Sequence, residues 1–172
     1  MPTIRLVRAT PQLLAAAERS HAELATLLDA RIPDGWPEFP EAIPHTRAAI
    51  HDDPANAEWW MYFFVDERSG DLVGSGGFAG PPTDGVAEVG YEIAPRFRRQ
   101  GYASAALAEL IALAESSPRV NRLAAHTLLS DERSPGVLQA NGFRRTGIVH
   151  ADGQDVAAWA RDVPPPTTRV GA

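Results

Sequence analysis

The chain has 172 residues, of which 44% are hydrophobic and 22% are charged, a length and composition typical of one globular domain. It contains no cysteine, which excludes disulfides, thiolate metal sites and cysteine nucleophiles, and its net charge of −6 disfavours a nucleic-acid-binding surface. No apolar run is long enough to cross a bilayer, and the N-terminus lacks the apolar core of a signal peptide, so we expect a cytoplasmic protein without a membrane partner.

The first half of the chain predicts one strand, two helices and a hairpin. Residues 4–7 indicate a short opening strand. Thr10 is a good helix cap and Pro11 suits the first helical position, and apolar residues at helical spacing extend the predicted helix to about residue 30. A loop rich in helix breakers around Trp36 precedes a second helix over residues 41–50. Two apolar runs, residues 59–65 and 72–78, then predict a hairpin.

The second half alternates between strands and helices. We expect a strand over residues 86–93, ending at Ala94 because the residue before a proline avoids helical geometry. The pattern then predicts a helix over residues 101–115, a strand over 123–128, a short helix over 134–141 and strands over 143–150 and 156–161. This order predicts an α/β domain over residues 1–161 with a mixed sheet, followed by a Pro-rich C-terminal tail over residues 162–172.

The most informative segment is Arg-Arg-Gln-Gly-Tyr-Ala, residues 98–103, between a predicted strand and a predicted helix. The first N–H groups of a helix are unpaired and carry the positive end of the helix dipole. Gly101 and Ala103 are small enough to let a phosphate approach these groups, and Arg98 and Arg99 can add charge. An isolated Gly-x-Ala more often marks a plain turn, so the phosphate-site prediction depends on its flanking elements.

Two segments in order resemble the GNAT superfamily of N-acetyltransferases. Arg98-x-x-Gly101-x-Ala103 after a strand is similar to the family motif Gln/Arg-x-x-Gly-x-Gly/Ala, whose backbone N–H groups bind the pyrophosphate of acetyl-CoA. Residues 131–143 resemble the segment Asn-x-x-Ser-x-x-Val-Leu-x-x-x-Gly-Phe of the ribosomal-protein alanine N-acetyltransferase-like branch. The resemblance covers about residues 4–160.

The resemblance implies a GNAT fold: a mixed, mostly antiparallel sheet of about seven strands, flanked by about four helices, with splayed fourth and fifth strands. It implies acetyl-CoA as co-substrate and no metal. The expected cofactor contacts are the backbone at Ile93 and Ala94, beside the pantetheine arm, and the loop and helix start at Arg98, Arg99, Gln100, Gly101, Tyr102, Ala103 and Ser104. Asp131 completes the set, although it replaces the branch's usual Asn and lacks the amide donor.

Amine acylation requires a neutral amine and a proton for the departing thiolate. Glu88 is the candidate base, acting through water, because a carboxylate on a central strand needs a partner or a wet cavity. A structural ion pair is its alternative role, and Glu92 is less favoured because the arginines at 96 to 99 offer it such a pair. Many GNAT enzymes carry a tyrosine that acts as general acid at the position where this chain has Leu138. The resemblance therefore leaves Ser134 as the candidate proton donor, with a helix cap as its alternative role.

Trp36 is the candidate substrate-binding residue. The segment around it, residues 32–37, resembles the same branch, and we expect an exposed indole that walls the acceptor pocket; the alternative is an aromatic residue that fills the core. The histidines have no metal-ligand spacing, and we expect His126 to be a satisfied interior or rim histidine.

These observations predict an N-acetyltransferase that transfers an acetyl group from acetyl-CoA to a primary amine. The acceptor is either a protein N-terminus or a small-molecule amine, and a homodimer is compatible with the resemblance. Without cysteine a ping-pong route through a thiol is excluded, so we expect direct attack in a ternary complex. The alternative is a non-catalytic acyl-CoA-binding module that senses or regulates.

Overall fold

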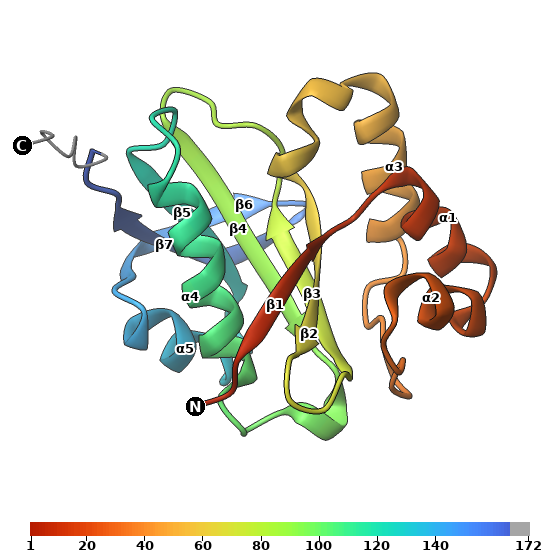
Figure 1. Ribbon diagram of the computed structural model, residues 1–172. Helices are drawn as coiled ribbons and strands as arrows, with labels where there is room; N and C mark the ends of the chain where they lie inside the picture. Colours follow the sequence, from red (N-terminus) through yellow and green to blue (C-terminus); the bar gives the residue numbers. More distant parts are fainter. Residues whose placement is uncertain (166–172) are drawn as a thin grey trace, which may run out of the picture.

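A seven-stranded sheet in the order β1-β2-β3-β4-β5-β7-β6 forms the centre of the computed structural model, which describes residues 1–165 (Figure 1). The strands are β1 (Ile4–Arg8), β2 (Met61–Asp66), β3 (Leu72–Phe78), β4 (Val86–Ile93), β5 (Arg122–Leu128), β6 (Arg144–Ala151) and β7 (Gln154–Asp162). Neighbouring strands run antiparallel except β4 and β5, which are parallel. The predicted α/β fold with a mixed, mostly antiparallel sheet is confirmed.

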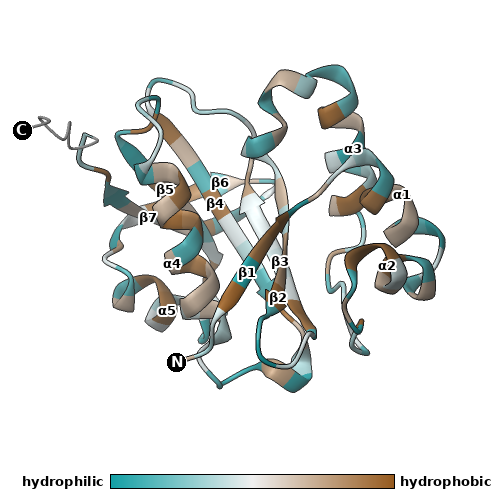
Figure 2. Cartoon of the chain, in the orientation of Figure 1, coloured by the Kyte–Doolittle hydropathy of each residue, from teal (hydrophilic) through white to brown (hydrophobic). Residues whose placement is uncertain are grey.

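Helices cover both faces of this sheet. They are α1 (Pro11–Arg19), α2 (His21–Leu28), α3 (Ala42–Asp52), α4 (Tyr102–Glu115) and α5 (Ser134–Ala140), with short 3-10 helices η1 (Pro54–Trp59) and η2 (Pro95–Phe97). In Figure 1, α4 and α5 lie together beside β5, whereas α1, α2 and α3 form a separate group beyond β2 and β3. Figure 2 shows apolar residues along β1 and on the helices beside the sheet. Within residues 1–165, no helix is both long and apolar enough to span a membrane.

The single helix expected from Thr10 to residue 30 is wrong, because Ser20 breaks it. Ser20 has an extended backbone (φ −165°, ψ 128°), and its hydroxyl accepts a hydrogen bond from the N–H of Glu23 at the start of α2. Serine competes in this way with helix continuation, and the apolar spacing continues across the break. Thr10 caps α1 as predicted, accepting from Leu13 N at 3.2 Å.

The parallel pair β4–β5 separates after a short seam. Pairing joins Val86 to Arg122, Ala87 to Leu123 and Glu88 to Ala124, and then stops, although both strands continue. The predicted splay of the fourth and fifth strands is therefore confirmed, and we call the unpaired region the fork.

The direction of the β4 backbone follows from its bonds to β3. Ala94 N donates to Val73 O, and Glu88 O accepts from Ala79 N, so the even-numbered residues of β4 bond to β3. Backbone groups alternate in direction along a strand, so the N–H and C=O groups of Tyr91 and Ile93 face the fork.

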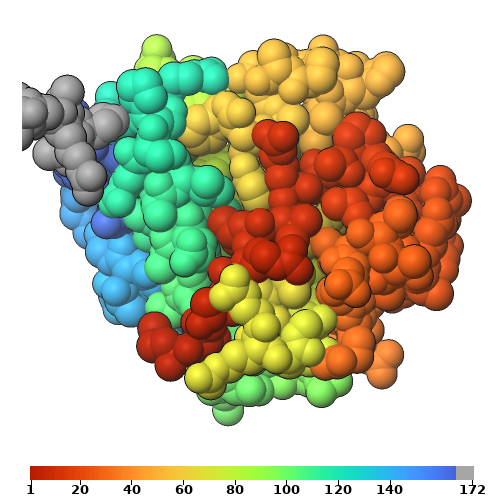
Figure 3. Space-filling view, in the orientation of Figure 1, coloured from red at the N-terminus to blue at the C-terminus, as the bar shows by residue number. Residues whose placement is uncertain are grey.

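The N-terminal residues and Val163, which follows β7, both pack against the domain. Figure 3 shows the N-terminal residues, in red, between α4 and the β2–β3 turn. At the other end β7 continues to Asp162, and Val163 is buried and donates its N–H to Asn121 O at 2.9 Å. The remainder of the predicted tail, residues 166–172, lies outside the described residues.

Candidate active site

Two cavities meet at the C-terminal half of β4. The larger, of about 840 Å³, lies between the end of β4 and the starts of α4 and α5, and the smaller, of about 370 Å³, lies against α3 and the β2–β3 hairpin. Phe39, Tyr91 and Glu92 line both cavities, so the two spaces adjoin beside β4. We call them the helix-side cavity and the hairpin-side cavity. The helix-side cavity is lined by these residues expected from the sequence: Ile93, Arg98, Arg99, Gly101, Tyr102, Ala103, Ser104, Asp131 and Ser134.

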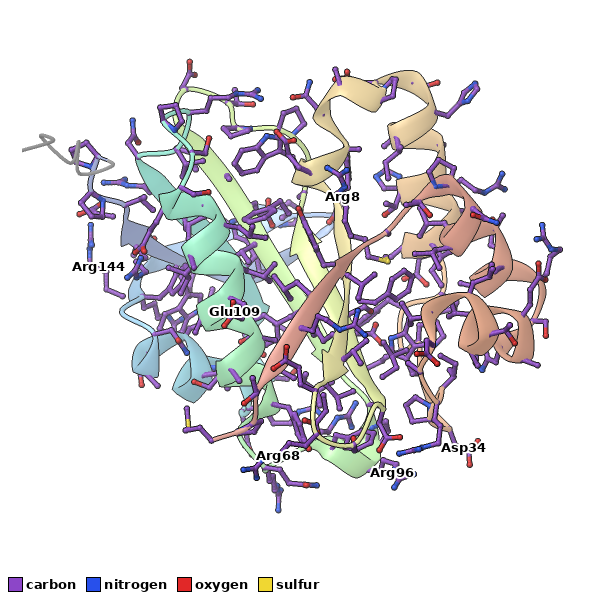
Figure 4. The ribbon with its side chains drawn as sticks, viewed as in Figure 1. Arg8, Asp34, Arg68, Arg96, Glu109 and Arg144 are labelled. Carbon is purple, nitrogen blue, oxygen red and sulfur yellow. The ribbon has the colours of Figure 1, made fainter. Side chains whose placement is uncertain are left out.

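The start of α4 presents unpaired backbone N–H groups to the helix-side cavity. Gly101 caps the helix in the left-handed conformation (φ 87°), which a residue with a side chain adopts only at a cost. Ala105 N bonds to Gly101 O at 3.0 Å, so the N–H groups of the preceding first-turn residues lie ahead of the helix ladder. This end of the helix carries its positive dipole, and Figure 4 shows Arg68 and Arg96 extending from the same end of the molecule. The arrangement is suited to an anionic group.

The polar side chains of the loop before α4 differ in whether they are already hydrogen-bonded within the protein. Arg98 is held inside the protein: its Nε donates to Ile93 O at 3.0 Å and its guanidinium pairs with Glu38 at 3.0 Å. Gln100 donates to Arg96 O at 2.8 Å and does not line the cavity, and neither does Ala94. Arg99 is exposed, lines the cavity and has no side-chain partner among residues 1–165. Of this loop, Arg99 is therefore the arginine best placed to meet a ligand.

The start of α5 forms the opposite wall of the helix-side cavity. Asp131 Oδ1 accepts from Arg133 N at 2.8 Å and from Ser134 N at 3.1 Å, so Asp131 takes the capping role that was the alternative for Ser134. Burial raises the pKa of Asp131, but the hydroxyl and N–H of Ser134 and the N–H of Arg133 outweigh it and hold the pKa below its usual value. Asn141 donates to Ser104 Oγ at 2.9 Å and ties α5 to α4.

Tyr91 brings a phenol to the junction of the two cavities. Its hydroxyl is buried and has no hydrogen-bond partner within the described part of the chain. Burial raises the pKa of Tyr91 to about 12; the nearby Ser134 hydroxyl lowers it and the charge of Asp131 raises it. Sequence reasoning assigned no role to Tyr91, because its importance depends on the fork beside it.

Glu92 anchors the loop that covers both cavities. Its carboxylate accepts from the backbone N–H groups of Glu38, at 2.8 Å, and Phe39, at 3.2 Å. The expected ion pair with arginines 96 to 99 is therefore wrong; Arg98 bonds to Glu38 instead. Burial raises the pKa of Glu92, and the two N–H bonds offset part of that effect.

Glu88 lies at the inner end of the fork and lines the hairpin-side cavity. Its Oε1 is 2.8 Å from Nδ1 of His126 on β5, and the two side chains are 45% and 32% exposed, so water reaches both. The sequence predicted a satisfied interior or rim position for His126 but did not identify Glu88 as its partner. The Glu88–His126 contact joins residues 38 apart in the chain, and only the parallel register brings them together.

Trp36 is buried, contrary to the exposed position expected from its loop. It is 2% exposed, its indole N–H donates to Ser75 Oγ at 3.0 Å, and its ring packs against Phe63. It lines neither cavity. Contact of Trp36 with a substrate stays a prediction, and its position favours support of the sheet beneath the hairpin-side cavity.

Metal-ligating groups do not gather anywhere in the described chain. Residues 1–165 contain no set of three or more His, Cys, Asp or Glu side chains placed to hold a metal ion.

Comparison with known proteins agrees with this geometry. The profile of the acetyltransferase (GNAT) domain family matches residues 8–144. The uncharacterised N-acetyltransferase YjdG of Bacillus subtilis is 29% identical over 136 residues, which cover 77% of this chain and 80% of YjdG.

Two solved structures share the fold at low identity. RimL, an α-N-protein acetyltransferase of a ribosomal protein, solved with coenzyme A, superposes with a TM-score of 0.66 at 21% identity and covers 94% of each chain. A spermidine N-acetyltransferase chimera of Vibrio cholerae SpeG superposes with a TM-score of 0.64 at 15% identity, over 93% of this chain and 95% of that one. The family match, the fork and the helix start together lead to one conclusion: the chain belongs to the GNAT acetyltransferase family and is an acyl-CoA-dependent N-acyltransferase.

Proposed function

We propose that the protein transfers the acetyl group of acetyl-CoA to a primary amine by direct attack in a ternary complex. The observation that carries this proposal is the fork: unpaired backbone of β4 lies between the start of α4 and a second cavity. The pyrophosphate of acetyl-CoA lies against the first turn of α4 and Arg99, and the pantetheine arm bonds to the backbone of Ile93 within the fork. The helix-side cavity receives the co-substrate and the hairpin-side cavity receives the amine.

The reaction needs little more than alignment and two proton movements. The amine nitrogen attacks the thioester carbonyl carbon, and the carbon–sulfur bond breaks with its electron pair on sulfur. Glu88 accepts the proton that the amine loses, through water, and its contact with His126 fixes the carboxylate and gives the proton a second acceptor. Ser134, on the far side of β4, donates toward the sulfur. The base and the donor thus act from opposite faces of one strand.

The hairpin-side cavity fits an amine that arrives with a positive charge. Its charged lining residues are Glu88 and Glu92, with His45 beside them, and no arginine lines it. A cation is attracted to such a site before it loses its proton. The two acceptors that fit are a protein N-terminus, the acceptor class of RimL, and a small-molecule amine such as spermidine, the acceptor of SpeG.

An acceptor screen tests the proposal directly. The chain contains neither cysteine nor lysine, so coenzyme A release can be followed with a thiol reagent against no protein background, and acetylation of the protein's own lysines cannot occur. A panel of polyamines, aminoglycosides and short peptides with free N-termini should contain a substrate. Binding of acetyl-CoA without turnover across the panel would support the binding-module alternative instead.

Variants then assign the proton roles. Glu88→Gln should lower kcat throughout about pH 6 to 9, because it removes the base but keeps the shape of the side chain. Ser134→Ala should also lower kcat over this range, because it removes the hydroxyl proposed to donate to the sulfur. Unchanged turnover in either variant removes that residue from the mechanism.

A further inference from the structure

We propose that the Tyr91 hydroxyl donates a hydrogen bond to the sulfur of coenzyme A as the thiolate departs. This inference rests on the proposed function, and it adds a catalytic residue to the base and donor named above. The step balances without another reagent. The amine proton passes to the Glu88 side, the electron pair of the broken carbon–sulfur bond stays on sulfur, and the Tyr91 O–H and the Ser134 hydroxyl converge on that charge.

The first support is the state of the phenol itself. Two polar side-chain atoms within residues 1–165 are buried without a hydrogen-bond partner, Trp59 Nε1 and the Tyr91 hydroxyl. Trp59 packs against Phe78 under Arg119 and lines neither cavity, so its indole has no route to a ligand. Tyr91 lines both cavities. A buried hydroxyl without a partner is costly, so a ligand that supplies an acceptor there is favoured.

The second support is the position of Tyr91 on β4. Its N–H and C=O groups face the fork, where the pantetheine arm is proposed to lie, and its side chain, perpendicular to the sheet, lines the cavities on either side of β4. The hydroxyl lies near Ser134, and the Asp131 carboxylate in the same wall already accepts from the start of α5. The Tyr91 hydroxyl can therefore donate a hydrogen bond at the inner end of the proposed pantetheine arm, where the thioester would lie.

The third support is the protonation state. The pKa of about 12 keeps the phenol protonated at neutral pH. The hydroxyl is thus a donor in every turnover, and it is placed to stabilise charge that develops only as the bond breaks.

The chain supplies a matched control among its tyrosines. Tyr62 is also a tyrosine of the sheet and is buried, but its hydroxyl donates to Glu58 O at 2.9 Å, away from the fork. Tyr62→Phe should keep kcat within about two-fold and lower the unfolding midpoint by about 2–4 °C, because it breaks a made hydrogen bond. Tyr91→Phe should show the reverse: kcat should fall about 30- to 300-fold with an unchanged or higher midpoint. The affinity for acetyl-CoA should stay within about three-fold, because the donor acts on the departing sulfur.

A spectroscopic measurement tests the contact without relying on turnover. The chain has no cysteine, so thiolate absorbance near 240 nm in the complex, after subtraction of the ligand-free titration, reports the coenzyme A sulfur alone. A hydrogen-bond donor favours the thiolate, so Tyr91→Phe should raise the pKa of the bound thiol by about one unit relative to wild type and Tyr62→Phe.

The outcomes separate this inference from the proposed function. An unchanged thiol pKa in Tyr91→Phe overturns the contact, and so does a loss of kcat that comes with a lowered midpoint and weakened binding. A third outcome is that wild type binds coenzyme A, its bound thiol has a lower pKa than the bound thiol of Tyr91→Phe, and no amine is acetylated. The contact then stands and the proposed function fails.

Discussion

Gly101→Asp is the sharpest test of where the co-substrate binds. Gly101 precedes the first turn of α4 and lines the helix-side cavity. An aspartate there places a negative charge beside the unpaired N–H groups proposed to hold the pyrophosphate. Space is not the obstacle, because a Cβ at this position would lie 3.4 Å from its nearest neighbour, Pro2 Cδ, an ordinary contact.

Two free energies are involved, and they affect different measurements. The left-handed backbone at Gly101 (φ 87°) costs a non-glycine residue about 1 kcal/mol, which lowers stability. The charge acts on binding: two unit charges about 5 Å apart at an effective dielectric of about 20 repel by about 3 kcal/mol. Gly101 is exposed, so screening reduces this to about 2 kcal/mol, or about 30-fold in Kd.

Calorimetric titration of coenzyme A measures the second quantity, and Gly153→Asp is its control. Gly153 has nearly the same backbone (φ 79°) with nothing within 4 Å of a Cβ, and it lies in the β6–β7 turn away from both cavities. Both variants should lose similar stability, and only Gly101→Asp should lose affinity, by less at high salt. Equal affinities in the two variants would refute the placement of the pyrophosphate at α4.

The remaining predictions concern the support of the site. Trp36→Phe should lower the unfolding free energy by about 1–3 kcal/mol in urea titrations, because it leaves a small void and removes the donor to Ser75; a neutral result would contradict the buried position. Glu92→Gln replaces one of two acceptor oxygens, so amide exchange at Phe39 should accelerate while global stability changes by less than about 1 kcal/mol; unchanged exchange would show that the loop is held elsewhere. Burial raises the pKa of Asp66, but its bonds from Arg68 N, Tyr102 and Ser69 outweigh that and lower the pKa overall. Its stabilising contribution is therefore present above the ordinary carboxyl pKa and lost as the pH falls through the lowered value, and Asp66→Asn should flatten stability curves below about pH 4; parallel curves would disprove this assignment.

The sequence predicted the features whose physics is local. The helix start proposed to bind phosphate has a glycine in the left-handed conformation with small residues after it, and all of these lie within residues 98–104. The order of strands and helices likewise follows from periodicity and breakers. The fork came from resemblance, because nothing in the composition of β4 or β5 requires them to separate after Glu88.

The contacts that sequence reasoning missed join distant residues. The indole N–H of Trp36 donates to Ser75, 39 residues away in the chain. The Glu92 carboxylate accepts from the N–H groups of Glu38 and Phe39, which are more than 50 residues away. Each depends on sheet register, which a single sequence leaves undetermined. Ser20 is the opposite case: it broke a helix locally, and the apolar spacing concealed it.

The short seam between β4 and β5 divides the sheet into two ribbons, β1–β4 and β5–β7, joined directly by three residue pairs. In the proposed complex, a pantetheine arm bonded to Ile93 would act as a temporary extra strand along the edge that β5 leaves unpaired. Binding would add hydrogen bonds to the sheet itself, and product release would remove them. The enzyme should consequently resist proteolysis more strongly when it holds acetyl-CoA than when it is free, because the ligand would join the two ribbons across the fork.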